Sequence, residues 1–291
     1  MNPKTFTAYS GLVVLSLIWG IAFVAIKEVV TELSPVNLAL MRWLIAAVPF
    51  LILFPIIGRP KVPFARKDAP RLLVVALANV AGYHISLNYA ETTLSAGLSA
   101  LLIAFGPIFI VLLSYFLLNE RVGRRILVGL VLAIAGIAVL SLGSISVSDF
   151  SSFAGIFEAL LTALCYALFA VLGKPLVQKY GSASTTITAG LVGTAMMTPL
   201  LSRSFFSQAA SLSIGGWVGV LYLSLLSTVF GYLMFYTLVS RGAVSRLSIQ
   251  LYLIPVVSVI GGAIFLAEPV TAAVVVGGGM MLAAVGVATW K

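Results

Sequence analysis

The chain has 291 residues, of which 61% are hydrophobic and only 9% are charged, and its mean hydropathy is +1.17. A soluble domain carries roughly 25% charged residues because its surface faces water. The composition therefore excludes an ordinary soluble fold and predicts an all-α integral membrane protein.

Ten apolar runs are long enough to cross a bilayer, for which a helix needs roughly 20 residues because the hydrocarbon core is about 30 Å thick. In chain order they span residues 9–26, 36–57, 70–90, 94–118, 125–142, 154–173, 185–201, 214–239, 244–267 and 270–290. Turn-forming and charged residues fill the short connections, as in Ser34-Pro35 and Gly181-Ser182. No small-residue cleavage site follows the first run, so we expect it to be a retained span and not a signal peptide.

The net charge of +9 would suggest a nucleic-acid partner in a soluble protein, but the basic residues follow the topology of the predicted spans. With the N-terminus inside, fourteen of the seventeen Lys and Arg residues lie in inside segments, while Lys27 and Arg203 lie outside and Arg42 lies within a span. Short loops rich in Lys and Arg stay in the cytoplasm. Both termini are therefore predicted to be cytoplasmic, and no nucleic-acid partner is predicted.

The chain contains an internal repeat. A shift of 148 residues places Pro107 on Pro255, Glu120 on Glu268 and Gly129 on Gly277, and a shift of 149 places Gly82-Tyr83 on Gly231-Tyr232. We therefore expect one membrane domain built from two five-helix repeats, residues 1–148 and 149–291. Because five is an odd number, the second repeat would be inverted. Such repeats are common in secondary transporters, where the substrate lies between them near the midplane, although channels contain them too.

Several motifs resemble a known family. The first run ends in Ile18-Trp19-Gly20-Ile21-Ala22-Phe23, the second contains Leu40-Met41-Arg42-Trp43, and Pro107 with Glu120 and Pro255 with Glu268 precede Gly-rich helices. Together these features resemble the drug/metabolite transporter superfamily, in particular its ten-span exporters with two EamA-type repeats. The second repeat departs from the pattern, because Ala163-Leu164-Cys165-Tyr166 stands near the position of Trp-Gly and no arginine matches Arg42.

The resemblance implies export of small metabolites, often amino acids, across the plasma membrane of a bacterium or archaeon. The aromatic-amino-acid exporters are the branch that best suits the polar and aromatic residues in the spans. The broader alternative is an exporter of drugs or other metabolites.

Polar residues within a span are costly and are therefore candidates for the substrate site. In the third run, His84, Asn88 and Glu91 share one helix face and Asn79 and Tyr83 form an adjacent stripe. They predict a cavity wall; the alternative is hydrogen bonding that holds neighbouring helices together. For Glu91, near the outer interface, a solvated helix end is the alternative.

Aromatic and polar residues in other runs complete the predicted substrate site. Its further candidates are Trp19, Ser99, Tyr166, Tyr232, Tyr236, Gln250 and Tyr252. For the tyrosines of the eighth run the alternative is an interfacial aromatic belt. Pro107 and Pro255 each remove a helical hydrogen bond and so predict kinks, which either serve gating or are static. Arg42 is expected to snorkel towards the outer interface or to pair with Glu28 or Glu32, with binding of a substrate carboxylate as the alternative.

Other function classes have little support in the sequence. No paired carboxylates or catalytic triad suggest an intramembrane enzyme, no ring of filter residues suggests a channel, and no P-loop suggests ATP-driven transport. We expect no cofactor and no metal, because His84 and Cys165 are the only histidine and cysteine. His84 and Glu91 are candidates for proton coupling, with flow down the substrate gradient as the alternative. The partners expected are a small-molecule substrate and the lipid bilayer; a monomer is compatible with the sequence, which does not determine the oligomeric state.

Overall fold

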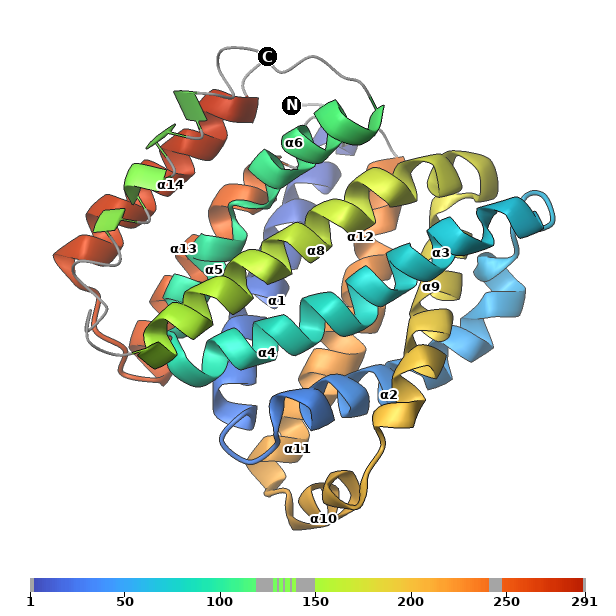
Figure 1. Ribbon diagram of the computed structural model, residues 1–291, viewed down its shortest axis with the longest axis horizontal. Helices are drawn as coiled ribbons and strands as arrows, with labels where there is room; N and C mark the ends of the chain where they lie inside the picture. Colours follow the sequence, from blue (N-terminus) through green and yellow to red (C-terminus); the bar gives the residue numbers. More distant parts are fainter. Residues whose placement is uncertain are drawn as a thin grey trace.

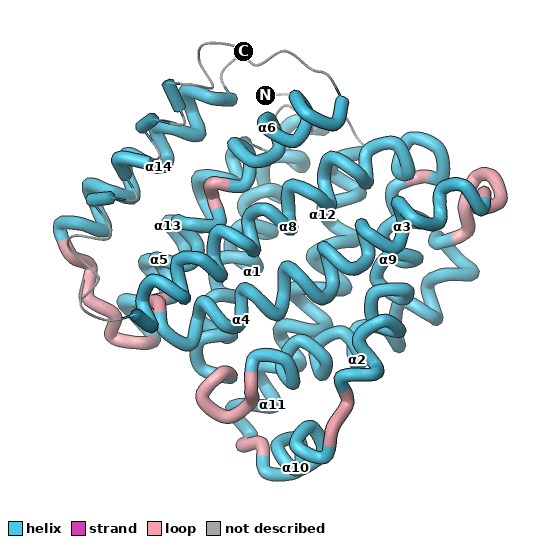
Figure 2. The backbone as a smooth tube through the Cα atoms, in the orientation of Figure 1, coloured by secondary structure: helices cyan, strands magenta, loops and turns pink. Residues whose placement is uncertain are grey.

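The structure is a computed structural model that describes residues 3–118, 128–129, 131–132, 134–136, 138–139, 150–240 and 248–289. The described residues form a single bundle of helices joined by short loops, and they contain no strand (Figure 2). This arrangement confirms the predicted all-helical class for the described part of the chain.

The helices of the first half run in order along the sequence (Figure 1). They are α1 (Pro3–Val29), α2 (Pro35–Leu53), the π-helix η1 (Phe54–Gly58), the 3-10 helix η2 (Arg66–Asp68), α3 (Ala69–Ala76), the π-helix η3 (Leu77–Gly82), α4 (Tyr83–Thr93), α5 (Ala96–Ile103) and α6 (Gly106–Leu118). The stretches η1, η3 and α4 continue the helices before them, so that one predicted run corresponds to several consecutive elements.

The described residues of the second half also form helices joined by short loops. It contains α8 (Phe150–Tyr180), α9 (Ser182–Met197), the 3-10 helix η4 (Thr198–Leu200), α10 (Arg203–Ser211), α11 (Ile214–Leu221), the π-helix η5 (Tyr222–Phe230), α12 (Gly231–Ser240), α13 (Ser248–Phe265) and α14 (Ala272–Thr289). Every predicted run except 125–142 coincides with described helices, and half of that run, with Glu120 before it, lies outside the described residues.

Six segments of the described chain are long and apolar enough to cross a membrane. They are Ser10–Val29, Pro35–Gly58, Arg66–Thr93, Ala96–Leu117, Phe153–Tyr180 and Ile214–Phe235, and the apolar helices Leu253–Phe265 and Ala272–Ala284 are shorter. Large apolar side chains are exposed on several of them, for example Ile52 at 62%, Phe116 at 71% and Phe157 at 64%. An exterior of this kind suits contact with lipid, which indicates a multi-pass membrane protein.

Local sequence signals set several helix boundaries. The hydroxyls of Ser34, Ser95 and Ser213 cap the first turns of α2, α5 and α11, since each accepts a hydrogen bond from the backbone N–H three residues further along the chain. Gly181, between α8 and α9, has a φ of 92°, a left-handed conformation that glycine adopts without strain. The predicted turn at this position is therefore confirmed.

The short helix α10 was not predicted. Its residue Gln208 accepts a hydrogen bond from the Asn37 side chain at 2.7 Å and from the Ser34 backbone N–H at 3.0 Å. Helix α10 therefore holds the start of α2 at the end of the bundle where α11 begins (Figure 1).

Helices from the two halves pack against each other in matching pairs. Helix α1 lies along α11, η5 and α12, and in the same way α8 lies along α3, η3 and α4. Helix α2 packs against η5, and α9 packs against η3. Figure 1 shows α8 running side by side with the continuous helix formed by α3, η3 and α4.

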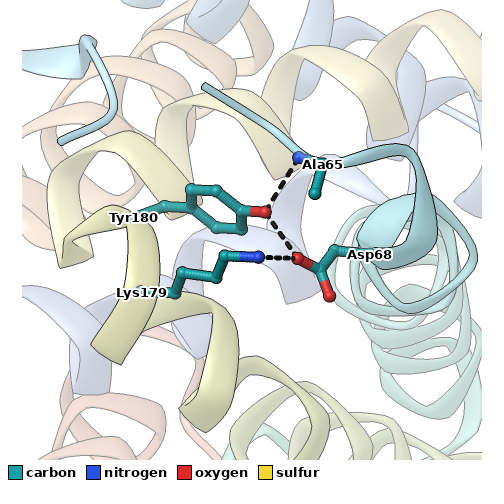
Figure 3. Close-up of polar contacts among 4 residues, drawn as sticks. All are labelled: Ala65, Asp68, Lys179 and Tyr180. Carbon is teal, nitrogen blue, oxygen red and sulfur yellow. Dashed lines mark hydrogen bonds and ion pairs between the residues drawn. The ribbon is translucent and has the colours of Figure 1, made fainter. Parts of the chain in front are cut away.

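Hydrogen bonds fasten the paired helices at opposite ends of the bundle. At the end of α8, Lys179 Nζ lies 2.6 Å from Asp68 Oδ2, and Tyr180 Oη donates to the same carboxylate and accepts from the Ala65 backbone N–H (Figure 3). Beyond the end of α1, Glu32 accepts hydrogen bonds from the Ser213 hydroxyl at 2.7 Å and its backbone N–H at 2.8 Å, which hold the pKa of Glu32 below its usual value.

Candidate functional site

Six ring-bearing side chains form a continuous group in the bundle. We call it the aromatic cluster; it consists of Trp19, Trp43, Tyr83, His84, Tyr166 and Tyr232. The ring of Tyr232 lies 6.1 Å from that of Trp19 and 6.2 Å from that of Trp43, centroid to centroid. The ring of His84 lies 5.3 Å from Trp43 and 4.9 Å from Tyr83. Tyr166 completes the cluster at 6.5 Å from Tyr83, so the cluster joins α1, α2, α4, α8 and α12.

The cluster has a fully buried centre and a more accessible border. Trp43 and His84 are 0% and 1% exposed, whereas Trp19, Tyr83, Tyr166 and Tyr232 each keep an intermediate exposure. Four aromatic side chains are therefore partly exposed although they belong to helices packed within a bundle. Aromatic side chains of this kind suit the apolar part of a small molecule.

Polar atoms around the cluster are incompletely hydrogen-bonded. Trp19 Nε1 donates to the Ser227 carbonyl at 3.0 Å, and Tyr232 Oη lies 3.4 Å from Asn79 Oδ1. By contrast, Trp43 Nε1, Asn79 Nδ2 and both ring nitrogens of His84 are buried and have no partner among the described residues. Most buried polar groups in proteins are paired, so a concentration of unpaired ones favours a ligand site.

Two of the three described π-helices, η3 and η5, lie next to the cluster. η3 ends at Gly82, directly before Tyr83, and η5 ends directly before Gly231-Tyr232. A Cβ added to Gly82 would lie 2.7 Å from Cys165 Sγ on α8, and one added to Gly231 would lie 2.7 Å from Trp19 Nε1 on α1. Each glycine thus permits a close helix contact beside a π-helix, a helix type often found at functional sites.

The structure brings together six of the predicted site residues. These are Trp19, Asn79, Tyr83, His84, Tyr166 and Tyr232. The side chains of Pro107, Tyr236, Gln250 and Tyr252 lie outside those that the structure describes. Asn88 is buried, and its Nδ2 donates to the Pro35 carbonyl at 2.8 Å, which joins α4 to the start of α2.

Glu91 and Ser99 form a second buried polar group near the end of α4. Both side chains are 0% exposed, and neither the Glu91 carboxylate oxygens nor Ser99 Oγ has a hydrogen-bond partner among the described residues. The ammonium group of Lys27 instead donates to the carbonyls of Glu91 and Leu94, both at 2.7 Å. The interpretation of Glu91 as a solvated helix end is therefore wrong, because the packing of α1 and α5 covers it.

Arg42 does not snorkel and does not pair with an acidic residue of the α1–α2 connection. It is 5% exposed, and its guanidinium donates to Thr228 Oγ1 at 2.8 Å and Ser227 Oγ at 3.1 Å. Glu32, a predicted partner, accepts from Ser213 instead. The first interpretation of Arg42 was wrong because the π-helix η5 offers hydroxyl partners deep in the bundle.

The two prolines predicted to kink their helices have different surroundings. The helix before Pro107 is interrupted, since α5 ends at Ile103 and α6 begins at Gly106. Pro255 is buried within α13, which continues from Ser248 to Phe265. A gating role for either proline stays a prediction.

Sequence reasoning missed three residues of this site: Trp43, Ser227 and Thr228. The sequence feature that could have indicated Trp43 is its position directly after Arg42, the charged residue within the second apolar run. Ser227 and Thr228 gave a weaker signal, two adjacent hydroxyl side chains in an otherwise apolar run.

The comparisons with known proteins agree with this architecture. The sequence profile of the EamA-like transporter family matches residues 6–142 and again residues 153–290. The chain belongs to the EamA-like transporter family. This membership confirms the resemblance to the drug/metabolite transporter superfamily and indicates a transporter rather than an enzyme.

Several members of the EamA-like family are similar to the chain over nearly its whole length. An uncharacterized transporter of Archaeoglobus fulgidus is 34% identical over 91% of this chain and 92% of the relative. A probable terminal-alkyne amino-acid exporter of Streptantibioticus cattleyicolor is 28% identical over 97% and 93%. A probable amino-acid metabolite efflux pump of Salmonella typhimurium is 25% identical over 92% and 89%.

A solved crystal structure shares the fold. It superposes with a TM-score of 0.64 over 97% of this chain and 96% of the other, at 16% identity. In the part of this EamA-like chain that the structure describes, no group of three or more His, Cys, Asp or Glu residues has an arrangement that would hold a metal ion.

Proposed function

We propose that the protein is a secondary transporter that exports small metabolites, in particular aromatic and hydrophobic amino acids, across the plasma membrane of a prokaryote. The observation that carries this proposal is the aromatic cluster, whose members come from both halves of the chain. Its partly accessible rings suit an apolar side chain, and its unpaired polar atoms suit a polar head group. The names of two relatives, an amino-acid exporter and an amino-acid metabolite efflux pump, support the substrate class.

We further propose that ten spans form two inverted repeats, residues 1–148 and 149–291, that alternate access to the site. The double match of the family profile, the paired packing of α1 and α8, and the equivalent π-helices support this arrangement. With both termini in the cytoplasm, the Asp68–Lys179 contact lies on the cytoplasmic face and the Glu32–Ser213 contact on the outer face.

Transport by purified protein in liposomes tests the proposed function. We expect saturable uptake of labelled phenylalanine or leucine, competed by unlabelled aromatic and aliphatic amino acids, and none by liposomes without protein. Competition by structurally unrelated drugs would favour the broader exporter. Absence of uptake of any amino acid by folded, inserted protein would contradict the amino-acid proposal.

Proton exchange at Glu91 is the coupling that we propose, with His84 as the second candidate. An ionised carboxylate is costly to bury, and the Glu91 side chain is 0% exposed. The groups that act on Glu91 electrostatically are Lys27 on α1 and Glu268 beyond α13, with the Ser99 hydroxyl beside it. Binding and release of a proton would thus alter the contact between the ends of α1, α4 and α5.

The variant Glu91→Gln tests the coupling. Because glutamine stays neutral, we expect a pH gradient no longer to drive accumulation of substrate in liposomes. Exchange of labelled for unlabelled substrate across the membrane should persist. Glu28→Gln is the matched control, because Glu28 is exposed on the last turns of α1. An unchanged pH dependence of transport in both Glu91→Gln and His84→Gln would show that neither residue carries the proton.

A further inference from the structure

Arg42 is a buried positive charge whose described partners are all neutral. Its side chain is 5% exposed in the middle of α2, and two of its five N–H groups donate to the hydroxyls of Ser227 and Thr228. Both acceptors are neutral hydroxyl oxygens, so neither of these hydrogen bonds supplies a negative charge to the guanidinium. Burying a charge without a counter-ion is costly, so a position of this kind is kept where the charge serves a ligand or a partner.

The surroundings of Arg42 contain no carboxylate among the described residues. The ionisable groups that act on its guanidinium are the phenols of Tyr232, Tyr83 and Tyr222 and the imidazole of His84. Of the acidic residues near the end of α1, Glu28 and Glu32 are exposed and Glu32 is engaged with Ser213. The described part of the chain thus leaves a positive charge unneutralised beside the aromatic cluster.

The π-helix η5 fixes the direction of the guanidinium. Thr228 donates its own hydroxyl proton to the Leu223 carbonyl at 2.8 Å, so its oxygen is free to accept from Arg42. The hydroxyls of Ser227 and Thr228 thus bind one edge of the planar guanidinium group. Trp43, the next residue on α2, contacts the rings of both His84 and Tyr232. Charge and apolar surface are therefore adjacent.

We propose that Arg42 binds the carboxylate of the transported molecule and thereby defines the substrate class as organic acids with an aromatic or apolar body, α-amino acids included. This inference rests on the proposed transport function. A guanidinium recognises a carboxylate with two parallel N–H donors, a geometry that favours carboxylates over amides and amines. The apolar body of the ligand then packs against the rings of the aromatic cluster.

A series of four ligands that share one phenyl group tests the inference. They are phenylalanine, 3-phenylpropionate, phenylalaninamide and phenethylamine, of which the first two carry a carboxylate. Binding is followed by tryptophan fluorescence of the purified protein, since Trp19 and Trp43 belong to the cluster. We expect the carboxylates to bind about tenfold to a hundredfold more tightly than the amide and the amine, the range for a hydrogen bond to a charged group.

The variant Arg42→Gln should abolish this preference, while Arg42→Lys should keep part of it because the charge remains. Ser227→Ala removes one hydroxyl anchor and keeps the guanidinium, so it should preserve the preference even where it lowers stability. Arg203→Gln, at an exposed position of α10, is the matched charge control. A purely structural Arg42 would instead give similar losses in Arg42→Gln and Ser227→Ala without changing the order of the four ligands.

The outcomes separate this inference from the transport function. Transport of amino acids without a preference for carboxylates, unchanged by Arg42→Gln, would overturn the inference and leave the transporter intact. A failure to bind or transport any of the four ligands would contradict the proposed function as well.

Discussion

Valine in place of Gly231 is expected to lower transport by about tenfold or more, because overpacking of a tight contact costs about 1–3 kcal/mol. A Cβ at this position would lie 2.7 Å from Trp19 Nε1 and 3.4 Å from the Leu226 carbonyl. Trp19 cannot turn away without losing its hydrogen bond to Ser227. The added methyl groups would therefore separate α1 from α12 at the edge of the aromatic cluster. Uptake in liposomes measures the effect.

The matched control is Gly215→Val on α11. The nearest atom to an added Cβ there is Ser213 Oγ at 3.6 Å, an ordinary van der Waals distance. We expect this variant to transport at nearly the normal rate. Normal uptake by Gly231→Val would show that the close approach of α1 and α12 is not required for function.

Removal of the Trp43 ring is expected to destabilise the protein by about 3–5 kcal/mol, the usual cost of truncating a buried tryptophan to alanine. Trp43 is 0% exposed and its ring contacts those of Phe50, His84 and Tyr232. The thermal unfolding temperature of Trp43→Ala in detergent should therefore fall clearly below that of the unmodified protein.

The more conservative variant Trp43→Phe separates packing from binding. Phenylalanine keeps most of the ring contacts but lacks Nε1–H, which is unpaired in the described structure. We expect near-normal unfolding with weakened substrate binding. Trp217→Ala, on α11 with 39% exposure, controls for the loss of a tryptophan. Equal binding by Trp43→Phe and the unmodified protein would show that the indole N–H has no role in the site.

The positions of the helices were predictable because lipid imposes a strong local constraint. A run that crosses the bilayer must be apolar and helical, so the runs around Arg42 and His84 could be read from composition alone. Turn residues such as Gly181 were equally clear. The helix α10 was not predicted because it is short. Its role depends on the contact of Gln208 with Asn37, which lies 171 residues away in the sequence.

The candidate site was most predictable where polar residues interrupt an apolar run. Asn79, Tyr83 and His84 stood out for this reason, whereas Trp43 was not singled out although it directly follows Arg42. The partners of Arg42 lie 185 and 186 residues along the chain, and no local pattern connects them. The π-helices η3 and η5 were also beyond sequence reasoning, because the extra residue per turn is stabilised by packing against other helices.

The contacts at Asp68 and Glu32 bear on how the bundle moves. One fastens α8 to the start of α3, and the other fastens the end of α1 to the start of α11. Since each of these pairs also packs along its length, we expect each to travel as a rigid body during the transport cycle proposed above. The bodies that rock against each other would then each combine helices from both halves of the chain. The boundary between the two moving bodies would therefore differ from the boundary between the two sequence repeats. Each repeat would contribute helices to both moving bodies.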